Sequence, residues 1–191
     1  MGKKAILTFF FLMILASNNY AVDLNLGLFY GQRTVNDSEI RHTYGYGYIY
    51  FPYLSVNFSK SIIFGLGYEG GYSKKGEIGI YQEPARLKVA GPEAFVCYQL
   101  RVKSFFPYLK IGCGYFAYKQ TVESPYVEEY KVDHKKATVT LSGGFKIFIL
   151  NNFFLGAEVK YVPFKVQPYE YRVDLGGIRY LVGLGFRFEL K

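Results

Sequence analysis

Residues 178–190 restrict the fold of this chain more than any other segment. Apolar side chains alternate there with glycines and charges: Tyr180, Val182, Leu184, Phe186, Phe188 and Leu190 against Arg179, Gly183, Gly185, Arg187 and Glu189. Because successive side chains of a β-strand point to opposite faces, such a strand has one wholly apolar face and one polar face. This arrangement suits a position between membrane lipid and a polar lumen, so the segment favours a transmembrane β-barrel.

The first 21 residues have the composition of a secretory signal peptide. Lys3 and Lys4 precede an apolar run at residues 5–16, and Ala21 is a small residue at which cleavage can occur. The run falls short of the roughly 20 residues that a membrane-spanning helix needs. We therefore expect a signal peptide at 1–21 and a barrel domain at 22–191. Cleavage removes two lysines and no acid, which lowers the formal charge from +8 to +6.

Seven further segments alternate with the period of a strand, and each is about as long as the 9 to 11 residues of a tilted membrane strand. They are 22–31, 46–58, 61–72, 93–102, 106–118, 137–149 and 153–164. The fourth is the least regular of them. Proline cannot donate a hydrogen bond to a neighbouring strand, so we expect Pro92 to mark a bulge or a loop edge.

The connections between these segments fall into two classes. Residues 59–60, 103–105 and 150–152 form tight turns, whereas 32–45, 73–92, 119–136 and 165–177 are long and polar. Outer-membrane barrels have short periplasmic turns and long extracellular loops. The prediction is an all-β, eight-stranded antiparallel up-and-down transmembrane β-barrel. A soluble lipocalin-like barrel is the alternative fold, but charges interrupt the inward faces and none is expected on an outward face.

The chain resembles the small eight-stranded outer-membrane β-barrels of diderm bacteria, of the OmpX and OmpA transmembrane type, and the outer membrane protein beta-barrel domain family. The C-terminal insertion signal of such proteins is matched by Gly183, Phe186 and Phe188, although Leu181 stands where a polar residue is usual. The resemblance implies the cell outer membrane as the location and insertion by the barrel-assembly machinery. We also expect a monomer.

Six charged side chains are expected to face inward at a similar depth in the membrane: Glu69, Glu93, Lys110, Glu158, Lys160 and Arg179. The lumen of an eight-stranded barrel is only wide enough for side chains to fill it. Unpaired charges there would be costly, so three acids that meet three bases predict a polar plug. An ion-conducting pore is the alternative. Inward glycines would make room beside these long side chains.

Tyrosines and phenylalanines are expected to form two girdles at the membrane interfaces. The outer girdle would contain Tyr44, Tyr46, Tyr48 and Tyr50, and the inner one Phe58, Phe105, Phe106, Phe153 and Phe188. Alternation places Cys97 inward, opposite residue 110, and Cys113 outward, which argues against a disulfide.

Enzymatic chemistry finds little support in the sequence. Only His42 and His134 are present, and neither forms the His-x-Ser pair of a lipid A deacylase. We expect no catalytic residues, metal site or cofactor, and no nucleic acid partner, because the bases are scattered. Outer-membrane lipid and lipopolysaccharide are the expected partners.

The leading functional hypothesis is a non-enzymatic surface barrel with charged loops, which include Glu123, Glu128, Glu129, Lys131, Lys135 and Lys136. A narrow channel for small or apolar solutes and a lipid A-modifying enzyme are the alternatives.

Overall fold

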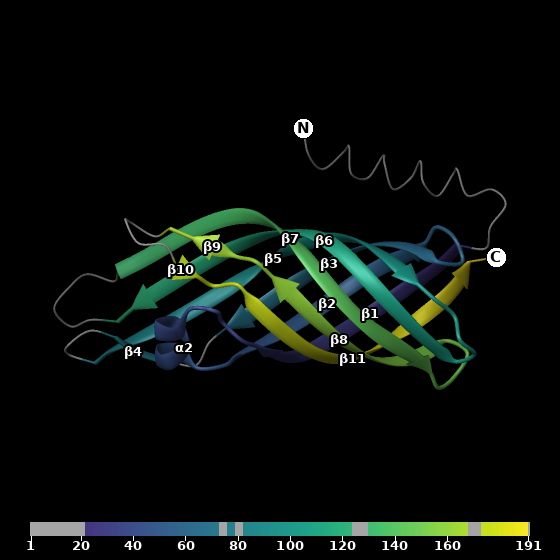
Figure 1. Cartoon of the computed structure of the whole chain (residues 1–191), viewed down its shortest axis with the longest axis horizontal. Helices are drawn as coiled ribbons and strands as arrows, with labels where there is room; N and C mark the ends of the chain where they lie inside the picture. Colours follow the sequence, from purple (N-terminus) through teal and green to yellow (C-terminus); the bar gives the residue numbers. More distant parts are fainter. Residues whose placement is uncertain (1–21, 73–75, 79–81, 124–129, 168–172, 191) are drawn as a thin grey trace.

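The computed structural model describes residues 22–72, 76–78, 82–123, 130–167 and 173–190, so the expected signal peptide at 1–21 lies outside the described residues. Eight long antiparallel strands form a closed barrel (Figure 1). They are β1 (Val22–Arg33), β2 (Gly47–Asn57), β3 (Ile62–Tyr72), β5 (Glu83–Gln99), β6 (Phe105–Val122), β7 (Tyr130–Phe148), β8 (Phe153–Val162) and β11 (Gly177–Leu190). β11 pairs with β1 and β3 pairs with β5, which closes the sheet as predicted.

Four short elements lie at the end of the barrel that carries the long connections (Figure 1). They are the helix α2 (Ser38–Tyr44) and the strands β4 (Gly76–Ile78), β9 (Lys165–Val166) and β10 (Val173–Asp174). The opposite end carries the three tight turns, at 58–61, 100–104 and 149–152. No helix in the described residues is long and apolar enough to cross a membrane.

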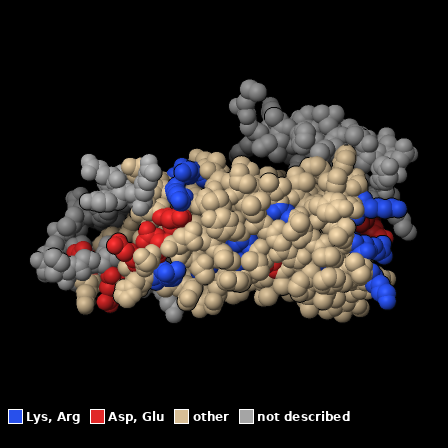
Figure 2. All heavy atoms as spheres, viewed as in Figure 1, with Lys and Arg blue, Asp and Glu red and all other residues tan. Residues whose placement is uncertain are grey.

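The outward faces of the strands form an apolar belt. Large side chains on these faces are exposed, among them Leu66, Val159 and Val182. Figure 2 shows a mostly uncharged middle, with Lys, Arg, Asp and Glu gathered toward the two ends. This distribution fits a barrel whose middle is surrounded by lipid.

The expected aromatic girdles are only partly correct. The rings of Tyr30 and Tyr48 stack at 6.2 Å near the long-loop end, and those of Phe153 and Phe186 meet at 5.3 Å near the turns. Tyr44 and Phe106, however, are buried side chains of the interior. An aromatic residue near an interface belongs to a girdle only if its position in the alternation also turns it outward.

Several strands are longer than predicted. β5 begins at Glu83 rather than at residue 93, and β6 and β7 continue their pairing to Val122 and Tyr130. The expected bulge at Pro92 is wrong, because Pro92 pairs with Tyr68 of β3 in an uninterrupted register. On the β6 side, pairing is missing at residues 91–92, which is where proline provides no N–H group.

The polarity of the strands reverses in these extensions. Ala85, Leu87 and Val89 are buried, whereas Arg86 and Lys88 are exposed. The expectation that no outward face carries charge is therefore wrong for this part of the barrel. Beyond the membrane, water replaces lipid around the barrel, so apolar side chains are more stable inside and charged ones outside.

The inward apolar side chains of the extensions form one core, which we call the outer core. It contains Val35, Tyr44, Ala85, Leu87, Val89, Phe116, Tyr118, Val122, Val162, Phe164, Val166 and Leu175. Helix α2, in the expected loop 32–45, contributes Tyr44 to it. The Asp37 carboxylate caps α2 by accepting from the N–H of Glu39 at 3.0 Å. Burial raises the pKa of the Tyr44 phenol, although this hydroxyl accepts a hydrogen bond from the Gln120 amide at 2.8 Å.

The lipid-facing belt can be tested with Leu66→Arg. We expect a loss of about 2 to 4 kcal/mol of folding free energy, because a charge near the midplane must leave water. The measurement is reversible urea unfolding in lipid bilayers. Ala137→Arg is the matched control, since Ala137 is exposed beside Lys135 and should tolerate a charge. Equal stability of Leu66→Arg and the unmodified protein would contradict the assignment of the faces.

The outer core makes a separate prediction about neighbouring residues of β5. Leu87→Ala should cost about 2 to 5 kcal/mol, because it leaves a cavity in a packed core. Lys88→Ala should cost little, since Lys88 is exposed. Unfolding of the two variants in the same bilayers measures the difference. Similar losses for both would show that the extension is not packed around an apolar interior.

Candidate functional site: the charged lumen

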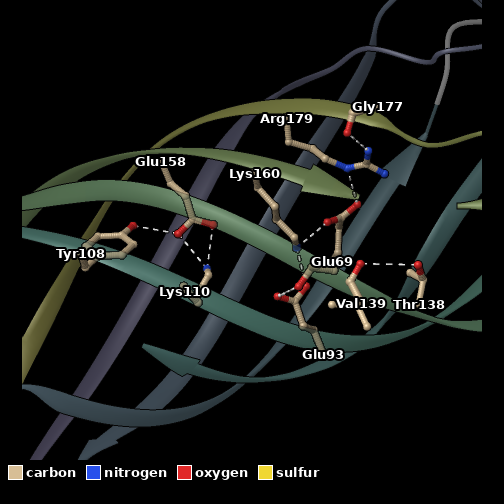
Figure 3. A network of polar contacts seen from close by, with 11 residues as sticks. Glu69, Glu93, Tyr108, Lys110, Thr138, Val139, Glu158, Lys160, Gly177 and Arg179 are labelled. Carbon is tan, nitrogen blue, oxygen red and sulfur yellow. Dashed lines mark hydrogen bonds and ion pairs between the residues drawn. The ribbon is translucent and has the colours of Figure 1, made fainter. Parts of the chain in front are cut away.

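The six charged residues that the sequence predicts in the lumen come from five strands. Glu69 lies on β3, Glu93 on β5, Lys110 on β6, Glu158 and Lys160 on β8, and Arg179 on β11. None of the six is more than 7% exposed. Figure 3 shows that they converge inside the barrel. We call them the charge layer.

One part of the charge layer is built around Glu158. The Lys110 ammonium lies 2.7 Å from both carboxylate oxygens of Glu158. The Tyr108 hydroxyl donates to the Oε2 atom of the same carboxylate, also at 2.7 Å. Glu158 is therefore fully partnered although it is buried, which is the condition under which a buried charge is tolerated.

The other part is built around Lys160. Its Nζ atom donates to Glu69 Oε2 at 2.7 Å and also to Glu93 Oε2 (Figure 3). Two further donors complete these carboxylates: Arg179 Nε donates to Glu69 Oε1 at 3.2 Å, and Thr140 Oγ1 donates to Glu93 Oε1 at 2.9 Å. Each of the three buried acids thus has at least two donors.

An aromatic ring connects the two parts. The Nζ atoms of Lys110 and Lys160 lie 4.9 and 4.5 Å from the centre of the Phe51 ring. Two cations over one ring are each attracted to its electron-rich face. A Cβ atom at Gly112 would come within 2.8 Å of Glu93 Oε1, so this inward glycine leaves room for the charge layer.

Two buried bases lie outside the predicted set. Arg33 is 1% exposed and faces Arg179 in the β1–β11 register, and its Nε and Nη1 atoms have no hydrogen-bond partner in the described residues. Lys146 sits over the rings of Tyr53, Tyr108 and Phe154, at 5.0 to 5.6 Å. Among the described residues, five buried bases therefore face three buried acids.

The sequence contained a pattern from which each of these two bases, Lys146 and Arg33, could have been predicted. Lys146 follows the inward alternation of segment 137–149, but it lies nearer the turn than the six residues of the charge layer. Arg33 lies just past the expected end of the first strand at residue 31, and the structure extends β1 to it.

The charge layer lies between two apolar regions of the lumen. The outer core fills the extracellular side. A second cluster, the inner aromatic cluster, begins at the depth of the charge layer and continues toward the periplasmic end; it contains Phe29, Ile49, Phe51, Tyr53, Ile63, Phe95, Cys97, Tyr108, Phe154 and Leu181. A cavity among these residues, bordered by Ser55 and Lys146, measures about 10 Å³. That volume holds about one water molecule.

Of the other residues singled out in the sequence, Cys97 lies in the lumen beside the charge layer, whereas Cys113, His42 and His134 are exposed. Cys97 is buried and pairs with Lys110 in the β5–β6 register, whereas Cys113 is exposed, so the two thiols are on opposite faces as predicted. His42 on α2 and His134 on β7 are exposed.

The insertion-signal residues occupy β11. Phe186 and Phe188 are exposed on the lipid face, and Gly183 is half-buried.

Glu158→Gln tests the pairing in the charge layer. Removing one charge of a buried pair leaves Lys110 uncompensated and should cost about 3 to 5 kcal/mol. The double variant Glu158→Gln/Lys110→Met removes both charges and should recover much of this loss. Urea unfolding in bilayers measures both variants. Equal losses in the single and double variants would show that the ion pair does not account for the effect.

Comparison with known proteins agrees with this architecture. Among solved structures, Ail of Yersinia pestis in complex with the heparin analogue sucrose octasulfate has a TM-score of 0.62 at 14% identity, over 88% of this chain and 100% of that one. OprG of Pseudomonas aeruginosa has a TM-score of 0.61 at 14% identity, over 89% of this chain and 97% of that one. Neisserial surface protein A has a TM-score of 0.56 at 13% identity, over 87% of this chain and 97% of that one.

At these identities the three structures show the fold alone. Comparison with curated protein sequences finds no match. The profile of the outer membrane protein beta-barrel domain matches residues 5–188. The chain therefore belongs to the outer membrane protein β-barrel domain family and is located in the bacterial outer membrane.

Proposed function

We propose that this protein is a non-enzymatic outer-membrane barrel with a closed lumen, whose extracellular end binds molecules at the cell surface. A closed lumen is supported by two barriers that lie in series along the barrel axis, the charge layer and the outer core. In the charge layer, every carboxylate is ion-paired. Above it lies the outer core, which is apolar. An ion would have to separate buried ion pairs, which leaves uncompensated buried charges, and then cross the apolar region.

A surface role is supported by the shape and charge of the extracellular end. β5, β6 and β7 extend past the apolar belt and carry exposed bases, including Arg86, Lys119 and Lys135. In the structure of Ail, a barrel of the same fold is bound to a sulfated sugar, a heparin analogue. A barrel of this architecture can therefore bind an anionic saccharide.

A narrow channel is the second candidate function. The observation that favours it is the excess of buried bases over buried acids in the described lumen. Arg33 and Lys146 have no ion-pair partner in the described residues and give the lumen a positive bias. Any residual leak should therefore favour anions.

A lipid-modifying enzyme has less support. In the described part of the chain, no hydrogen bond or ion pair links His42 or His134 to a serine or an acid.

Planar-bilayer recording tests the closed lumen. We expect no conductance, or a very small one, from the purified barrel, because the two barriers lie in series. A large porin in the same membrane serves as the positive control, and liposome flotation verifies that the barrel is inserted. Stable, large channels from the unmodified protein would overturn the closed lumen and support the channel instead.

A further inference from the structure

β7 and β8 separate toward their extracellular ends, and a cleft opens there between β7 and β9. β7 pairs with β8 only from Leu141 to Phe148, and in the described residues no earlier position of β7 pairs with β8. After Val162, the chain turns toward β9, which pairs with β10. In the part of the chain that the structure describes, two side-chain hydrogen bonds span the gap: Thr138 Oγ1 donates to the Pro163 carbonyl, and Lys136 Nζ donates to the Lys165 carbonyl at 2.8 Å.

The cleft is basic and has a volume of about 390 Å³. The described residues that line it are His134, Lys135, Lys136, Lys165, Val166 and Gln167, and these include three ammonium groups and no carboxylate. The nearest ion pair joins Lys165 to Asp174 at 3.8 Å, with the lysine side chain 71% exposed. Asp174 offsets one of the three ammonium charges, and the described lining keeps a positive excess from Lys135 and Lys136, so the cleft suits an anion.

The height of the cleft places it in the headgroup layer of the membrane. Val139 is an exposed apolar residue of the lipid-facing belt, and Lys135 and Lys136 lie four and three residues beyond it. At a rise of about 3.3 Å per residue, Lys136 lies about 10 Å and Lys135 about 13 Å beyond Val139 along the strand. Strand tilt reduces these heights to about 8 Å and about 10 Å, which is the outer part of a headgroup layer about 5 to 8 Å thick.

An apolar groove on the outward face of the barrel, nearer the middle of the membrane, includes β7 and β8 and extends over the neighbouring strands β5, β6 and β11. It has a volume of about 660 Å³, and Leu141, Gly143, Val159 and Tyr161 are among the residues that line it. Gly143 leaves the groove open because it has no side chain. A basic cleft above an apolar groove matches a molecule with an anionic head and an acyl chain, which a free anion or a soluble sugar does not have.

We propose that this composite site binds lipid A of the outer leaflet, with its phosphate groups in the cleft and an acyl chain in the groove. The proposal deepens the proposed surface-binding role and does not depend on a closed lumen. Lys135 and Lys165 contribute charge to the phosphates. Lys136 also holds the two strands together through the Lys165 carbonyl.

Fluorescence titration of a Gln167→Trp reporter tests the proposal, because the chain has no other tryptophan. The reporter protein in detergent micelles is titrated with diphosphoryl lipid A and with the same lipid A after removal of its phosphates. We expect Lys135→Gln/Lys165→Gln to weaken binding of diphosphoryl lipid A by about tenfold or more. Lys88→Gln, which removes an exposed charge on β5, should leave binding unchanged. A heat-dependent gel shift verifies that each variant is folded.

Two further measurements distinguish lipid A from free phosphate as the ligand of the cleft. Inorganic phosphate at matched concentration should not displace lipid A. Gly143→Leu, which fills the groove, should weaken binding of lipid A. Equal binding of the dephosphorylated lipid, an equal effect of Lys88→Gln, or displacement by inorganic phosphate would overturn the proposal. Binding of sucrose octasulfate but not lipid A would also overturn it, while leaving a surface-binding role in place.

Discussion

The closed ladder of backbone hydrogen bonds is the constraint on which the rest of this structure depends. Lipid offers no hydrogen bonds, so a sheet in a membrane must leave no open edge. The seam between the first and last strands meets this need with pairing from Val22 with Leu190 to Arg33 with Arg179. Closure divides every strand into a lipid face and a lumen face, and the alternation of the sequence follows from that division.

The interior then follows from the small diameter of an eight-stranded barrel. Side chains must fill it, and the chain fills it with the inner aromatic cluster, the charge layer and the outer core. The charge layer is stable in this position because each carboxylate is held by at least two donors. The outer core allows the barrel to continue into water, where the preference of the two faces is opposite to that in lipid.

Alternation alone was enough to predict the eight strands, the three tight turns and the inward position of the six charged residues. It could not locate the strand ends, because the rule of an apolar outside and a polar inside was applied beyond the membrane. Arg86 and Lys88, with Leu87 between them, alternate as regularly as the membrane segments, but with the faces exchanged. The pairing of Lys160 with two carboxylates and the cleft between β7 and β9 depend on three-dimensional register, which periodicity does not specify.

Amide hydrogen exchange of the bilayer-inserted protein tests the closed, extended barrel most directly. Residues 23–32 of β1 should exchange as slowly as the centre of β6, because both strands are paired on two sides. Slow exchange should also continue to Leu87 of β5, beyond the apolar belt. Exchange within seconds along β1 and β11 would show an open sheet, and fast exchange throughout residues 83–90 would show that the barrel ends at the membrane surface.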